Sequence, residues 1–340
     1  MIKTFTENDN INDASSKAET ESGKSIDTRL VYGFLDAGKT TYISESIRDD
    51  LFYKRGFTLI LCFEEGEAEY DEEFLSEKNT SVVYYDSGAY GDGAGEESET
   101  DSVRRFCSES IEAYHPDRIY VEMNTMMQDL REMFPACMRV TVVVTFIDWA
   151  TMPLYFTNFK KMINQMVAES HQITFRGCPS KELLAPYSQA FRLMNQRASY
   201  LRQDPMGYHE KAFDMFLPFS LEESDIVISD EEYLPLWLDA LDHPEHYQGK
   251  TIHFSDPLEV RREEGSGRLS AGHVVMVCCM ADLQFMAFQI EGDADVPDKG
   301  WITLDAVAET VTDGFGQRKV KLRPVRSEMA QPPKNMILGA

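Results

Sequence analysis

The sequence predicts an α/β fold in which a mostly parallel sheet flanked by helices is followed by a small β-rich domain. Between residues 27 and 240, short apolar runs alternate with longer helical patterns, which is the rhythm of parallel strands joined by crossover helices. A glycine-rich turn follows the first apolar run. From residue 241 to residue 340, short apolar runs are separated by Gly, Asp and Pro, which is typical of an antiparallel sheet or an OB-like barrel.

The strands of the first domain are expected where the chain is most apolar. The run at 140–146 is continuously apolar, as in a central strand that is covered on both faces. The other expected strands are 30–32, 58–63, 81–85, 118–122 and 172–175. Helices are expected at 39–53, 100–114, 152–169 and 181–204. Residues 1–26 are polar and acidic with few large apolar groups, and we expect a disordered tail there.

Composition limits the function. The formal net charge of -25 argues against nucleic-acid binding, which depends on clustered Lys and Arg. No apolar run reaches the roughly 18 residues that span a bilayer, and the start of the chain lacks the pattern of a secretion signal. We therefore expect a cytoplasmic protein without direct membrane insertion. Its six cysteines are scattered apart from the neighbours Cys278 and Cys279, and they are expected to be reduced thiols.

The strongest motif is GFLDAGKTT at residues 33–41, which fits G-x-x-x-x-G-K-[ST] between an apolar run and a helix. The loop needs glycine because its backbone N–H groups wrap phosphates at a helix N-terminus. Lys39 is expected to contact the outer phosphates, and the Thr40 hydroxyl to ligate Mg²⁺. The motif predicts a P-loop NTPase domain that binds a nucleoside triphosphate. Its expected binding residues are Gly33, Asp36, Ala37, Gly38, Lys39, Thr40 and Thr41.

A second acidic residue is expected on the metal side of such a site. Glu122, in RIYVEMNTMM, lies at the end of an expected strand next to the loop. Asp148, at the end of VTVVVTFID, is the second candidate, because ligands gather at the carboxyl ends of parallel strands. Either acid is also compatible with a strand end in solvent.

The segments GFLDAGKTT, LCFEEGEAEYDEEF, VEMNTMM and TFIDWAT together resemble the CobW-like P-loop GTPases, and most of all a clostridial-type branch, over about residues 27–240. The resemblance implies GTP hydrolysis with Lys39 and Glu122 in the catalytic site, coupled to metallochaperone activity toward a metalloprotein client. At FRGCP, Arg176 and Pro179 replace the residues that read guanine in that family. Whether the nucleotide is GTP or ATP stays open.

Two cysteine-containing segments are candidate sites for Zn²⁺ or a similar metal. Cys62 precedes the acidic residues Glu64, Glu65 and Glu67, a mixture of thiolate and carboxylate ligands that suits a borderline metal. A buried strand cysteine followed by a solvated acidic loop explains the same pattern.

The second segment lies in the C-terminal domain, where YQGKTIHFSDPLEV, HVVMVCCMADLQFMAFQIEG and KGWITLDA resemble YcgQ-like proteins that accompany membrane permeases. Cys278, Cys279 and Asp282 are the candidate ligands there. If the two cysteines lie on one strand, they point to opposite faces, so only one shares a site with Asp282. His253 and His273 are further candidates, and simple burial of the thiols is the alternative. The resemblance implies a permease component as a partner.

Three functions are compatible with these patterns. The leading hypothesis is a nucleoside-triphosphate-binding protein, preferring GTP, whose Mg²⁺-dependent hydrolysis is coupled to metal handling. The alternative is a degenerate P-loop protein that acts as a scaffold or regulator with little or no hydrolysis. A kinase acting on a small substrate is the third.

Overall fold

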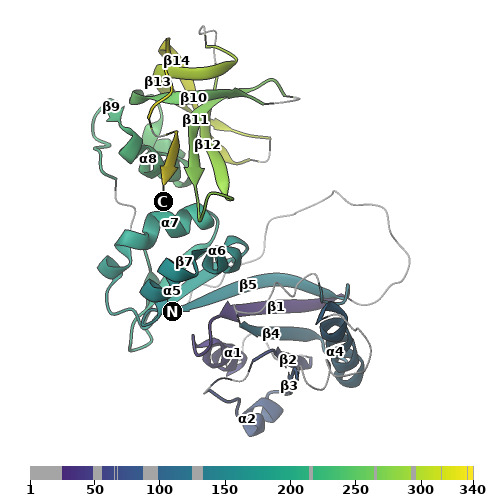
Figure 1. Ribbon diagram of the computed structural model, residues 1–340. Helices are drawn as coiled ribbons and strands as arrows, with labels where there is room; N and C mark the ends of the chain where they lie inside the picture. Colours follow the sequence, from purple (N-terminus) through teal and green to yellow (C-terminus); the bar gives the residue numbers. More distant parts are fainter. Residues whose placement is uncertain are drawn as a thin grey trace.

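The computed structural model describes residues 25–48, 56–64, 66, 68–86, 99–124, 133–213, 217–263, 266–291, 296–314, 316–334 and 336–339. Within these residues the chain forms two parts, each built on its own sheet (Figure 1). Nearly all of the expected tail at 1–26, and the end of the helix expected at 39–53, lie outside the described residues.

The first part contains an eight-stranded sheet in the order β3-β2-β4-β1-β5-β6-β7-β8. All neighbouring strands are parallel except β7 and β8, so the expected mostly parallel sheet is confirmed. The strands are β1 Ile26–Gly33, β2 Thr58–Cys62, β3 Thr80–Tyr84, β4 Arg118–Asn124, β5 Met138–Asp148, β6 Gln172–Arg176, β7 Ser199–Gln203 and β8 His209–Lys211.

Helices cover both faces of this sheet. Alternate residues of β1 point to opposite faces: Leu30 belongs to the core that contains Phe106, whereas Val31 belongs to the core that contains Ile43. Phe106 lies on α4 and Ile43 on α1, so these two helices lie on opposite faces of the sheet. The helices of this part are α1 Lys39–Arg48, α2 Glu72–Glu77, α4 Glu99–Tyr114, α5 Met152–Asn158, α6 Lys160–Ala168, η2 Lys181–Leu183 and α7 Ala185–Met194.

Two helix predictions are corrected. The helix expected at 152–169 is interrupted at Phe159, which separates α5 from α6. The prediction for 181–204 is wrong in its last part, because α7 ends at Met194 and β7 follows. Asn195 explains the change: its side-chain oxygen accepts hydrogen bonds from the backbone N–H groups of Arg197 and Ala198, which turns the chain away from the helix.

The second part is a closed β-barrel. Strands β10, β11, β12, β14 and β13 pair in that order, and β10 also pairs with β13, which closes the ring. The β12–β14 pair is parallel, and the other four pairs are antiparallel. This order is that of an OB-like barrel, and it confirms the expected β-rich second domain. Its strands are β10 Thr251–Arg262, β11 Leu269–Met276, β12 Leu283–Ile290, β13 Lys299–Thr312 and β14 Arg318–Ala330, with β9 Asp225–Ile228 and β15 Ile337–Gly339 at the margins.

Helix α8, Asp230–Asp242, packs against the barrel, and η3, Pro244–Tyr247, follows it. Ser229 and Glu232 form a capping box at the start of α8. The Tyr233 hydroxyl donates to the Met286 carbonyl oxygen of β12 over 2.9 Å. Because β9 lies before residue 241 and α8 begins before it, the barrel part uses residues on both sides of the expected boundary.

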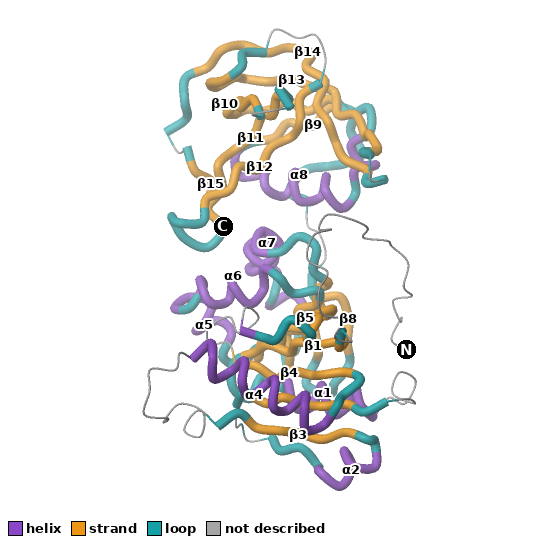
Figure 2. Tube along the Cα trace, turned by 90° about the vertical axis from the view of Figure 1, so that its right-hand side faces the viewer, coloured by secondary structure: helices purple, strands orange, loops and turns teal. Residues whose placement is uncertain are grey.

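The two parts meet where α7 faces α8 (Figure 2). Arg192 of α7 forms an ion pair with Asp242 at the end of α8. Among the described helices, none combines the length and the apolar character needed to cross a bilayer.

Candidate functional site

The glycine-rich loop lies between β1 and α1, at the carboxyl edge of the first sheet. Asp36 and Gly38 adopt positive φ values of 58° and 98°. A side chain at Gly38 would place its Cβ 2.7 Å from the Cδ atom of Arg176, whose guanidinium donates to the Asp36 carbonyl oxygen over 3.2 Å. The positive φ favours glycine at this position, and a Cβ atom there would also force the Arg176 side chain to move.

Lys39 is almost fully buried, at 2% exposure. Its ammonium group donates to the carbonyl oxygens of Gly33 and Phe34 over 3.1 and 2.8 Å. It also forms an ion pair with Glu64, which follows the end of β2. The lysine is thus held inside the loop by three oxygen acceptors.

Glu122 lies on β4 and is buried, at 1% exposure, and its two carboxylate oxygens contact different segments. One of its carboxylate oxygens accepts a hydrogen bond from the Thr40 hydroxyl over 2.7 Å. The other accepts from the Tyr70 hydroxyl and lies 3.7 Å from the Cys62 sulfur. The structure therefore brings the predicted residues Lys39, Thr40 and Glu122 together, and adds Tyr70, which the sequence motifs did not reveal.

Burial changes the acidity of this cluster. It raises the pKa of the Cys62 thiol to about 12, and the Glu122 carboxylate acts in the same direction. Burial also raises the pKa of Glu64, an effect that Lys39 opposes. The Cys62 thiol therefore stays protonated near neutral pH, which makes it a weak metal ligand unless a cation displaces the proton. Of the acidic residues expected beside it, Glu65 and Glu67 lie outside the described residues.

Three cavities follow one another along this edge of the sheet. The central cavity, of about 200 Å³, lies over the loop and is lined by Lys39, Thr40, Glu64, Glu122 and Arg176. A cavity of about 470 Å³ adjoins it on the Tyr70 side, and one of about 500 Å³ on the Arg176 side. The lining of the latter includes Thr41, Tyr42, Glu45, Asp148, Gln203, Asp204 and His209. Asp148 thus lines the cavity on the Arg176 side, whereas Glu122 lines the central one.

The central cavity fits a hard divalent cation. The Glu64 carboxylate lines this cavity, and its Oε2 atom is buried. The Thr40 hydroxyl and the Glu122 carboxylate supply further oxygen atoms in the same cavity. Carboxylate and hydroxyl oxygens with room for water are the surroundings that Mg²⁺ prefers.

The thiol pair of the barrel lies in a turn and not on a strand, because β11 ends at Met276 and β12 begins at Leu283. The expectation that the two thiols point to opposite faces is therefore wrong. The Cys278 sulfur lies 3.7 Å from the Cys279 sulfur and 3.4 Å from the Asp282 Oδ2 atom. The Asn164 amide of α6, in the first part, donates to the same Asp282 oxygen over 3.1 Å.

The two thiols differ in acidity. Burial and the neighbouring Cys279 and Asp282 raise the pKa of Cys278 to about 12. Hydrogen bonds, above all from the Ala281 backbone N–H group, lower the pKa of Cys279. Cys279 is therefore the readier thiolate of the two.

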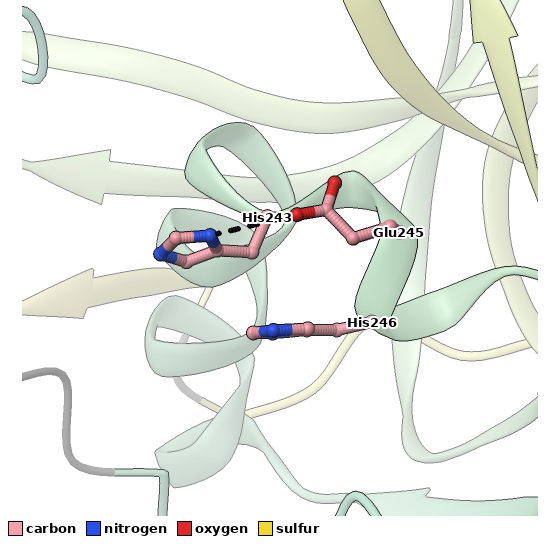
Figure 3. Close-up of side chains that lie close together, drawn as sticks. All are labelled: His243, Glu245 and His246. Atoms are coloured by element: carbon pink, nitrogen blue, oxygen red, sulfur yellow. Dashed lines mark ion pairs between the residues drawn. The ribbon is translucent and has the colours of Figure 1, made fainter.

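The histidines considered beside this thiol pair have other partners. His253 Nδ1 lies 2.9 Å from Asp305 Oδ1, and the buried His273 has its Nε2 atom 3.3 Å from Asp230 Oδ1. The sequence motifs did not reveal a different group: His243, Glu245 and His246 lie together at the end of α8 and in η3 (Figure 3). The spacing H-P-E-H was its only signal in the sequence.

The first part thus has a P-loop α/β fold, and the second an OB-like barrel. The family model of the DUF1980 C-terminal domain matches residues 207–336, so this region is similar to that family. The match begins upstream of residue 241 and includes β9 and α8 with the barrel. None of the curated proteins matches the chain.

Two solved structures are similar to part of the chain. One is the hydrogenase maturation factor HypB from Archaeoglobus fulgidus, at 13% identity and a TM-score of 0.34, covering 53% of this chain and 81% of that one. The other is a Zn(II)-bound triple mutant of the YjiA GTPase, at 14% identity and a TM-score of 0.34, covering 53% of this chain and 58% of that one.

Proposed function

We propose that this protein binds a nucleoside triphosphate with Mg²⁺ in its P-loop, hydrolyses it, and couples that cycle to the handling of a transition metal. The observation that carries the nucleotide part is the buried Lys39 inside a strand-to-helix loop, with Thr40 hydrogen-bonded to Glu122 beside it. This arrangement supplies one cation, a hydroxyl and a carboxylate at a helix N-terminus, which are the groups that phosphates and Mg²⁺ require.

Each group has a definite task in this proposal. Lys39 turns from Glu64 toward the outer phosphates, and the backbone N–H groups of the loop donate hydrogen bonds to the phosphate oxygens. Thr40 and Glu122 hold the Mg²⁺ shell, directly or through water, and Mg²⁺ when bound neutralises charge on the phosphates. Arg176 lines both the central cavity and the neighbouring cavity of about 500 Å³, which is the space we assign to the nucleoside.

The base is not fixed by this cavity, although its lining favours recognition through acidic acceptors. Glu45, Asp148 and Asp204 line it together with Arg176. Carboxylates accept hydrogen bonds from amino and ring N–H groups, and both adenine and guanine carry an amino group. GTP stays the leading prediction because of the CobW-like resemblance, with ATP as the competitor.

The metal part of the proposal rests on the thiol turn. Two tetrahedral ligands of Zn²⁺ with Zn–S bonds of about 2.3 Å lie about 3.8 Å apart, and the two sulfurs of the turn lie 3.7 Å apart. The Asn164 side-chain amide of the first part donates a hydrogen bond to the Asp282 carboxylate of this turn. A metal bound here is therefore next to the nucleotide-binding part. A cytoplasmic location, a metalloprotein client and a permease partner belong to this proposal as predictions.

Calorimetric titration with GTP, ATP and GDP, with and without Mg²⁺, tests the nucleotide part. Thr40→Ala is the informative variant because it removes one hydroxyl and leaves the Lys39 ion pair in place, and Ser108→Ala on the exposed face of α4 is its matched control. We expect Mg²⁺-dependent binding that Thr40→Ala weakens and Ser108→Ala leaves unchanged. Absence of binding by the wild-type protein to all three nucleotides would overturn the proposal.

One observation favours the second candidate, a degenerate P-loop scaffold with little or no hydrolysis. The Lys39 ammonium group already has three oxygen acceptors without nucleotide, and Glu64 provides a full countercharge. A phosphate-release assay with GTP and ATP distinguishes the two candidates. Turnover that rises with Mg²⁺ and is lost in Thr40→Ala excludes the scaffold, whereas tight binding without turnover supports it.

A further inference from the structure

We propose that His243, Glu245 and His246 bind a divalent transition-metal ion at a site of their own, separate from the P-loop and from the thiol turn. Their ligand atoms all lie within 4.8 Å of one another. The His243 Nδ1 atom lies 3.7 Å from Glu245 Oε1, and the two imidazole rings are stacked with centroids 4.8 Å apart (Figure 3). Because an imidazole nitrogen binds a metal in the plane of its ring, the His243 ring must turn out of this stack before the three ligand atoms can surround one ion.

The strongest support is the partner of His246. Its Nδ1 atom lies 2.9 Å from Asp239 Oδ2, and the Tyr247 hydroxyl donates to the same oxygen over 2.8 Å. The Asp239 side chain is only 1% exposed, so its carboxylate has a fixed position. A carboxylate that accepts from one ring nitrogen fixes the histidine tautomer and leaves the other nitrogen to bind a metal, an arrangement common around metal-bound histidines.

The backbone holds the three ligands close to one another before any ion binds. The His243 N–H group donates to the Asp239 carbonyl oxygen over 2.7 Å, and the His246 N–H group donates to the His243 carbonyl oxygen over 3.0 Å. Arg318 lies 3.5 Å from Glu245 Oε2, so it holds one carboxylate oxygen while Oε1 faces His243. Little chain entropy is lost when these groups bind an ion.

The chemical types of the three side chains indicate which metal ions the site would prefer. Two imidazoles and one carboxylate suit Zn²⁺, Ni²⁺ or Cu²⁺, whereas Mg²⁺ prefers oxygen atoms alone. Three protein ligands leave a coordination position for water or for a group from another molecule. His243 also lines a cavity of about 420 Å³ between α7 and α8, so the ion is bound beside the junction of the two parts.

The test uses the full chain with Cys278 and Cys279 replaced by serine, so that the thiol turn cannot bind Zn²⁺. Calorimetric titration with Zn²⁺ is compared in this background, with His243→Ala and His246→Ala added together, and with His115→Asn added alone. His115 is an exposed histidine at the end of α4 with a φ of 47°, which asparagine tolerates. Thermal unfolding without metal checks that each variant is folded.

We expect the background protein to bind one Zn²⁺ and to be stabilised by it. Loss of His243 and His246 should abolish this binding, whereas His115→Asn should leave it unchanged. Asp239→Asn should weaken it by about 10- to 100-fold, because the partner that fixes the tautomer is altered. Zn²⁺ binding that survives the double alanine substitution, or Mg²⁺ binding of equal strength at the same residues, would overturn the proposal. Neither result depends on whether the P-loop binds nucleotide.

Discussion

Lys39 and Glu64 form a buried ion pair inside the glycine-rich loop between β1 and α1, with side-chain exposures of 1% and 8%. The pair joins the start of α1 to the segment after β2, which are far apart in the sequence. Taking two charges out of water is costly, and the pair is stable only because the two carbonyl acceptors complete the hydrogen bonding of the lysine. If the loop binds nucleotide as proposed, the Glu64 carboxylate competes with phosphate for the Lys39 ammonium group.

The first prediction concerns this competition. Glu64→Gln removes the countercharge, and we expect the affinity for nucleotide measured without Mg²⁺ to rise about tenfold, or about 1.4 kcal/mol. With Mg²⁺ present the gain in nucleotide affinity should be smaller, because the substitution also removes a Glu64 carboxylate oxygen that could bind the ion. Calorimetry with GTP and ATP measures both effects. Glu77→Gln, on the exposed face of α2, is the control, and an affinity that falls without Mg²⁺ would contradict the competition.

A second prediction follows from the crowding at Gly38. Gly38→Ala would place a methyl group 2.7 Å from Arg176 at a φ of 98°, so we expect nucleotide binding to be lost and the loop to be displaced. Gly316 has a φ of 81°, and a methyl group there would meet no described atom within 4 Å, so Gly316→Ala carries only the backbone strain of about 1–2 kcal/mol. Equal effects of the two substitutions on nucleotide affinity would contradict a role of the Gly38 conformation in nucleotide binding.

The third prediction concerns the thiol turn. Asn164→Ala removes the amide that donates to Asp282 over 3.1 Å. We expect Zn²⁺ affinity, measured in a chain with His243 and His246 replaced by alanine, to fall by about tenfold. Asn158→Ala, at the end of α5, removes a comparable amide that donates to the Leu154 carbonyl oxygen instead. If both substitutions have the same effect, or neither has one, the amide has no part in metal binding.

The fourth prediction is a pH dependence of stability. Burial lowers the pKa of His273 to about 4, against opposing effects of Asp256 and Glu259. Because the folded state disfavours the charged imidazole, its contribution to stability is complete above the unfolded pKa of about 6.5 and is lost as the pH falls toward about 4. Burial also raises the pKa of the adjacent Asp230 to about 6. The folded state therefore favours the protonated Asp230 carboxyl, so the contribution of Asp230 to stability increases as the pH falls, opposite to that of His273.

His273→Gln separates the two effects. We expect the free energy of unfolding of the wild type, relative to this variant, to fall by up to about 3 kcal/mol between neutral pH and about pH 4. Urea unfolding at several pH values measures the difference. If the free energies of unfolding of the wild type and of His273→Gln change with pH in parallel, His273 does not titrate in this range.

Local chemistry explains what the sequence could predict. The P-loop motif is a contiguous segment, so the sequence alone could predict that Lys39 and Thr40 lie together where the loop meets α1. Glu122 followed from its place at a strand end next to the loop. The Lys39–Glu64 pair and the Tyr70 hydroxyl could not be predicted in the same way, because they depend on contacts between segments that are separated in the sequence.

The incorrect predictions from the sequence also involve features that depend on the three-dimensional structure. The apolar run HVVMVCCMA continues past the end of β11, so its pattern hides the turn that brings Cys278 and Cys279 together. The helix expected at 181–204 contains no proline after Pro186 to mark its end, and the bonds of Asn195 that end it become visible only in three dimensions. The order of strands in the barrel depends on pairing between distant segments, which periodicity does not report.

The short strands at the margins of both sheets have a consequence for how the protein behaves at high concentration. The barrel sheet ends in β9 and β15, of four and three residues, and the first sheet has the three-residue β8 at one side. Other chains can pair with the unpaired N–H and C=O groups of an edge strand. Edge strands as short as these expose few such groups. Among the described strands, these margins therefore give little opportunity for edge-to-edge aggregation.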